Sequence, residues 1–112
     1  MRPETRQNLA DARAAAEEAR VLAAGAWQES RITSLAVERL LMIVGQAFVR
    51  TRWSEPAVLD EIADAYKVIG MRNVLVHGYD ALDPARIRDA VEKSLPALIA
   101  ELDALLGAEI DA

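Results

Sequence analysis

Apolar residues recur at helical spacing along most of the chain, and this periodicity constrains the fold more than any other feature of the sequence. The first such stripe consists of Leu9, Ala12, Ala16, Ala19 and Ala23. Residues three and four apart share one face of a helix, and small side chains on that face let another helix approach closely. A first helix is therefore expected from an N-cap at Thr5 to about Ala24, with Gly25 as its left-handed stop.

A second helix is expected to begin at Ser30, a residue type that caps helix N-termini, and to end near Thr51. Apolar side chains again recur at helical spacing within this segment. The predicted buried line of the helix consists of Ile32, Leu35, Ala36, Leu40, Ile43 and Ala47.

The stretch "WSEP" indicates the start of a further helix, with Ser54 as its cap and Pro56 in its first turn. The pattern stays helical over residues 57–76, and Gly70 within it is expected to mark a break or a close helix crossing. Gly78 lies just past this helix, where a glycine takes a positive φ without a Cβ clash.

The last helix is expected to begin after Asp83, its cap, with Pro84 at the first helical position, and to run towards Leu106. Pro96 lies inside this segment and should kink or split the helix, because proline removes a backbone donor and clashes one turn back. The segments together predict an all-α fold, a four- or five-helix up-and-down bundle. With 112 residues the chain is expected to form a single domain over residues 1–112.

Composition narrows the classes of function. The chain has no cysteine, which excludes disulfides and thiolate chemistry and fits a reducing compartment. No apolar run approaches the roughly 20 residues of a membrane span, and the N-terminus is too charged for a signal peptide, so a cytoplasmic protein without membrane contact is expected. A net charge of −5 argues against a broad nucleic-acid surface but leaves room for a local basic pocket.

The stretch "RNVLVHGYD" brings a cation, an imidazole and a phenol close together in sequence. His77 is the only histidine, and it lies five residues after Arg72 and two before Tyr79. One interpretation is structural, since a histidine at a helix end can bond the last carbonyls and complement the helix dipole. On a continuous helix Arg72 and His77 point about 140° apart, whereas Asn73 is one turn before His77 and could hold its ring.

The other interpretation is catalytic. Metal-free RNA cleavage needs a base for the 2′-hydroxyl proton and an acid for the leaving oxygen. It also needs positive charge facing the phosphate. One chain offers one imidazole for both proton transfers, but a two-fold dimer with this stretch on its axis offers two, with two copies of Arg72. This chemistry therefore favours a homodimer.

Other catalytic arrangements find less support in the sequence. A metal site would need several histidine or cysteine ligands or a carboxylate cluster at ligand spacing, and neither is evident. No glycine-rich phosphate loop is present, so no metal and no cofactor are expected. Trp27 and Trp53 are expected to be core or interface anchors.

Three segments resemble one known family. "GMRNVLVHGYD" resembles the Arg-x4-His-x-Tyr signature of the HepT-like toxins of the HEPN superfamily. "ERLLMIVGQAF" is similar to the second-helix segment of that family, and "DPARIRDAVEKSLPALIAEL" to its closing helix, including Pro96. The resemblance covers roughly residues 5–106.

The resemblance implies an all-helical homodimer that cleaves RNA without metal, as the toxin of a type II toxin–antitoxin pair. It assigns acid/base catalysis to His77, phosphate stabilisation to Arg72 and a supporting role to Asn73. Tyr79 matches the tyrosine that a cognate MntA-type nucleotidyltransferase antitoxin adenylylates, which would add bulk and negative charge where the RNA phosphate sits. In a dimer cleft Arg72, His77 and Lys67 would each be doubled.

Two alternatives to the ribonuclease stay open. The chain could be a non-catalytic helical dimer that binds a nucleotidyltransferase partner or a nucleotide, with the motif positioning that nucleotide. It could also be a helix bundle in which His77 only caps a helix. RNA cleavage by the purified protein distinguishes the ribonuclease from the non-catalytic dimer.

Overall fold

The computed structural model describes residues 1–78 and 83–111, the last four of these by their backbone alone. The elements are α1 (Pro3–Leu22), the 3₁₀-helix η1 (Trp27–Glu29), α2 (Arg31–Ser54), α3 (Pro56–Leu59), α4 (Ala65–Val76), α5 (Pro84–Asp89), the π-helix η2 (Ala90–Ser94) and α6 (Leu95–Asp111). Since α5, η2 and α6 are continuous, they form one long helix. The described residues contain no strand, so the predicted all-α fold is confirmed.

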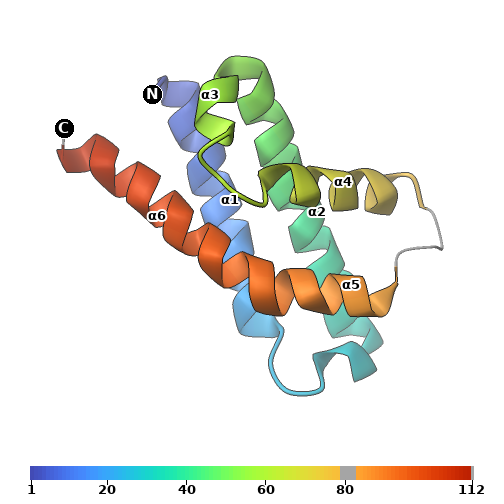
Figure 1. The fold of residues 1–112 in the computed structure, drawn as a ribbon. Helices are drawn as coiled ribbons and strands as arrows, with labels where there is room; N and C mark the ends of the chain where they lie inside the picture. The colour runs from blue at the N-terminus through green and yellow to red at the C-terminus, as the bar shows by residue number, and fades with distance from the viewer. Residues whose placement is uncertain (79–82, 112) are drawn as a thin grey trace.

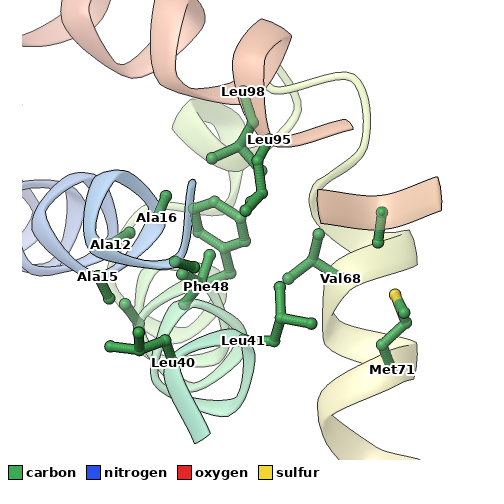
Figure 2. Close-up of a cluster of buried hydrophobic side chains, with 14 of the residues drawn as sticks. Ala12, Ala15, Ala16, Leu40, Leu41, Phe48, Val68, Met71, Leu95 and Leu98 are labelled. Atoms are coloured by element: carbon green, nitrogen blue, oxygen red, sulfur yellow. The ribbon is translucent and has the colours of Figure 1, made fainter. Parts of the chain in front are cut away.

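The helices α1 and α2 run in opposite directions side by side, and α4 and α6 lie across this pair (Figure 1). α4 packs on α2, and α6 packs on α1. Figure 2 shows the side chain of Phe48 from α2 between the alanines of α1 and Leu95 and Leu98 of α6. Phe48, Leu95 and Leu98 are fully buried, and the burial of such side chains stabilises the fold by roughly 1.5–3 kcal/mol each.

The small-residue stripe of α1 faces the core as predicted, and Gly25 adopts a φ of 56° after the helix. The expected caps at Thr5 and Ser54 are wrong. α1 begins at Pro3, and Thr5 is buried inside it with its Oγ1 2.9 Å from Ser54 Oγ at the end of α2. The two hydroxyls form a hydrogen bond with each other where α1 meets the end of α2, and neither caps the N-terminus of a helix.

The helix α2 starts as predicted, with the Ser30 side chain accepting a hydrogen bond from the Thr33 amide at 3.2 Å. It continues to Ser54, three residues beyond the expected end. The predicted buried line is only partly right, because Ile32 is 83% and Leu35 50% exposed, whereas Leu40 and Ala47 are buried. The side chains that α2 buries in the core instead form the neighbouring line, which consists of Val37, Leu41, Val44 and Phe48.

The segment over residues 57–76 is not one helix, because α3 ends at Leu59 and turns lead to α4 at Ala65. Gly70 neither breaks α4 nor lies at a crossing, since a Cβ there would meet open space. Gly78 has a φ of 66°, as expected for a glycine after a helix end.

The Asp83 cap is confirmed, with its Oδ1 accepting from the Ala85 amide at 2.9 Å. The long helix then widens into η2 immediately before Pro96 and continues to Asp111, past the expected end at Leu106. The Leu95 amide bonds the carbonyl of Ala90, five residues back. This wider turn accommodates a proline, which has no amide to donate and clashes with a regular turn.

Within the described residues, α2 is long and apolar enough, by length and composition alone, to cross a membrane. That differs from the expectation that no segment meets this criterion. A core helix of a soluble protein meets it equally well, and α2 packs against α1, α3 and α4. Length and composition therefore do not distinguish the two.

Candidate active site

The Arg72 side chain leaves α4 where α4 approaches α2 most closely, at Gly45. A Cβ built on Gly45 would lie 2.3 Å from the Arg72 Cβ, 2.9 Å from its Cγ and 3.2 Å from the Val68 carbonyl oxygen. The first two distances are below 3.0 Å, which real Cβ atoms essentially never show, so this crossing requires glycine. The sequence predicted either a break or a close helix crossing at Gly70. The close crossing is instead at Gly45, and it fixes the stem of Arg72.

The Arg72 guanidinium is held by two amide oxygens. Its Nη2 donates to Gln46 Oε1 at 2.6 Å, and its Nη1 donates to Asn73 Oδ1 at 2.8 Å. Its Nε is buried and has no hydrogen-bond partner among the described residues. Asn73 thus supports Arg72, which is a different contact from the predicted one with the His77 ring.

Arg72 lines an open pocket of about 510 Å³ between α1, α2 and α4. Arg39 and Arg50 of α2 also line it, and Asp11 and Glu18 come from α1. Three guanidinium groups against two carboxylates make this pocket locally basic in a chain of net charge −5. A local basic pocket of this kind can attract a phosphate despite the overall acidity.

His77 is the C-cap of α4, with φ −80° and ψ −1°, and its side chain is exposed. Its amide donates to the Asn73 carbonyl at 3.2 Å. The backbone remains helical from Arg72 to Val76, so within one chain the side chains of Arg72 and His77 leave the helix about 140° apart. The helix geometry of one chain therefore does not make them converge.

Two further candidates lie elsewhere. Lys67 lines a separate groove between α4 and α5, with its Nζ 3.4 Å from Ser94 Oγ. It does not line the pocket that contains Arg72. Tyr79, the proposed adenylylation target, lies outside the described residues.

Sequence reasoning missed Gly45, Gln46, Arg39 and Arg50 as residues of this site. A signal was present for Gly45 and Gln46: "VGQ" places a glycine and an amide inside the otherwise apolar run of α2. Such an interruption of a buried helix is a sign of close approach or of a polar contact. Among the described residues, no group of three or more histidine, aspartate or glutamate side chains could hold a metal ion.

A model of the ribonuclease HepT-like family matches residues 9–105. The matched range includes α2, α4 and every described residue of the basic pocket. Comparisons with curated proteins and with solved structures give no significant match.

Proposed function

This chain belongs to the ribonuclease HepT-like family, and from that premise we propose that it is a metal-independent RNA endonuclease, the toxin of a type II toxin–antitoxin pair that acts in the cytoplasm. The observation that supports this most is the arrangement of Arg72. Its guanidinium is held by hydrogen bonds in a basic pocket, on the same helix as the exposed His77 five residues further on. A fixed guanidinium suits a phosphodiester, which it can bind with two parallel hydrogen bonds.

In the proposed reaction the RNA 2′-oxygen attacks the adjacent phosphorus and the bond to the 5′-oxygen breaks. One His77 imidazole accepts the 2′-hydroxyl proton, and an imidazolium donates a proton to the leaving 5′-oxygen. Arg72 stabilises the negative charge that develops on the phosphate oxygens, and Asn73 supports Arg72. The products are a 2′,3′-cyclic phosphate and a 5′-hydroxyl.

We propose that two copies of the chain form this site through the outer face of α2. The face follows helical spacing along α2 and consists of Ile32, Leu35, Arg39, Met42, Gln46, Arg50 and Trp53. Its two ends carry exposed apolar side chains, with Ile32 83%, Leu35 50% and Trp53 74% exposed. Large exposed apolar side chains at both ends of one face favour burial by a partner.

The order of residues along this face fits a two-fold axis near its middle. An antiparallel second copy would bring Ile32 and Leu35 of one chain against Trp53 of the other, because isologous contacts exchange the two ends. The middle of the face carries Gln46, which is bonded to Arg72. Both Arg72 side chains would then lie near the axis, which a shared site requires.

The purified protein is expected to cleave single-stranded RNA in the presence of EDTA, and Leu35→Glu is expected to lose both the dimer and at least about 100-fold in cleavage rate. The reason is that a carboxylate at Leu35 would lose its hydration against Trp53 of the second copy, and one chain supplies only one imidazole. Light scattering and an assay with a fluorescent RNA measure the two effects.

The matched control is Val21→Glu, which places the same charge at a 61% exposed apolar position on α1. It should leave assembly and cleavage unchanged. A dimeric wild-type protein that leaves RNA intact would favour the non-catalytic partner of a nucleotidyltransferase, and a fully active monomer would contradict the shared site.

We further propose that a cognate MntA-type nucleotidyltransferase silences the toxin by transferring AMP to the Tyr79 hydroxyl. Tyr79→Phe should then cleave RNA normally but resist the antitoxin, because it lacks the acceptor oxygen. The measurement is intact mass after incubation with the antitoxin and ATP. Wild type should gain one or more AMP units and Tyr79→Phe none, with Tyr66→Phe as the matched control for an exposed tyrosine of α4. Equal modification of wild type and Tyr79→Phe would assign the acceptor elsewhere.

A further inference from the structure

Both groups that hold Arg72 are uncharged. The acceptors at 2.6 and 2.8 Å are the side-chain amide oxygens of Gln46 and Asn73. No described carboxylate forms an ion pair with Arg72. The guanidinium is therefore positioned without losing its net charge to a neighbour.

Arg2, Arg13 and Arg20 are the arginines that the described ion pairs join to carboxylates. Arg13 Nε lies 2.8 Å from Asp103 Oδ1, and Arg20 Nη2 lies 2.6 Å from Glu17 Oε1. The hydrogen bond from Arg13 lowers the pKa of Asp103, and the bond from Arg20 lowers that of Glu17. In those pairs the positive charge is largely neutralised by the partner.

Carboxylates are also present in the pocket of Arg72. Asp11 and Glu18 line it from α1, but neither is paired with Arg72, and Asp11 Oδ1 accepts from Gln7 Nε2 at 2.8 Å. The residue next to Gly45, which faces Arg72 from the opposite helix, is a glutamine. A glutamate has the same length and could accept the same hydrogen bond.

We infer that Gln46 is a positioning residue that orients Arg72 for a phosphodiester while leaving its charge uncompensated. This inference rests on the proposed ribonuclease function, since it names RNA phosphate as the anion. Gln46 and Asn73 take one N–H from each terminal nitrogen of the guanidinium. One N–H on each terminal nitrogen remains for a phosphate oxygen.

The decisive variant is Gln46→Glu, which keeps the hydrogen bond to Arg72 but pairs its charge. We expect its affinity for a 2′-O-methyl RNA oligonucleotide, which cannot be cleaved, to fall about tenfold or more. The slope of log affinity against log salt should decrease by about one for each Arg72 that contacts phosphate. The melting temperature should not fall, because the new ion pair retains the contact between α2 and α4.

Val21→Glu is the charge-matched control, since it also adds one negative charge, at an exposed position of α1 that does not line the pocket. It should leave both the affinity and the salt slope close to those of wild type. Gln46→Leu is the second variant, because it removes the acceptor without adding charge. It should keep most of the salt slope and lose cleavage rate, since Arg72 is charged but no longer oriented.

A second readout does not depend on RNA cleavage. Inorganic phosphate should shift the Arg72 Nε–H signal in a ¹⁵N-edited NMR titration of wild type, and this shift should be lost in Gln46→Glu. A phosphate response at Arg72 in a protein that cleaves no RNA would contradict the ribonuclease but support the role of Gln46. Equal phosphate and oligonucleotide binding by wild type and Gln46→Glu, or no response of Arg72 in wild type, would overturn the inference.

Discussion

Replacing His77 with alanine is expected to lower the rate of RNA cleavage by about 100- to 10,000-fold, the range that a positioned acid or base contributes. The fold should survive, because His77 is an exposed C-cap whose backbone amide bonds the Asn73 carbonyl, and alanine keeps that amide. A histidine at a helix end contributes at most about 2 kcal/mol. Cleavage of a fluorescent RNA and thermal unfolding measure the two quantities side by side.

Lys67→Ala provides the control for this experiment. Lys67 is an exposed cation of the same helix, but it lines the groove between α4 and α5 and not the basic pocket. Its loss should leave the rate of cleavage within a few-fold of wild type. Full activity of His77→Ala would refute the acid/base assignment and leave helix capping as the role of His77.

Gly45→Ala is expected to lower both the stability of the fold and the rate of RNA cleavage. The new Cβ would lie 2.3 Å from the Arg72 Cβ and 3.2 Å from a backbone oxygen of α4, so α2 and α4 must move apart. Overpacking of this kind costs about 1–3 kcal/mol. The same movement displaces Arg72, so activity should fall even under conditions where the protein stays folded. Denaturant unfolding and the cleavage assay measure both losses.

Gly70→Ala is the matched substitution in α4. A Cβ at Gly70 meets open space, and φ is not positive there. Alanine in a helix interior is favoured over glycine by roughly 0.5–1 kcal/mol, so this variant should be slightly more stable than wild type. If both alanine variants were equally stable, the close crossing at Gly45 would not exist as described.

Local signals in the sequence predicted the ends of several elements correctly. Ser30 and Asp83 act as hydrogen-bond acceptors for amides within three residues of themselves. Gly25 has the expected positive φ, although α1 ends at Leu22, two residues before the expected end. The buried face of α1 could likewise be predicted, because the spacing of its alanines is a property of that one helix. The failure at Thr5 and Ser54 has the opposite cause, because each finds its partner 49 residues away.

Contacts between residues far apart in the chain determine the features that the sequence did not predict. In α2 two neighbouring lines are both apolar, so periodicity alone does not tell which of Leu35 and Leu41 enters the core. Gly45 and Gly70 look alike in sequence, and only the crossing with α4 distinguishes them. In the same way, the contact between Gln46 and Arg72 spans 26 residues. The motif residues stand out in the sequence because they lie within one short stretch, whereas Gln46, which holds Arg72 from α2, was visible only in the structure.

The two tryptophans give the protein a pair of built-in optical reporters. Trp27 is 5% exposed in the core, whereas Trp53 is 74% exposed at the end of the outer face of α2. Indole emission shifts to the red and becomes accessible to soluble quenchers as water reaches the ring. Emission from Trp27 therefore follows unfolding, and quenching of Trp53 follows any partner that covers that end of α2. Single Trp→Phe variants separate the two signals without an attached dye.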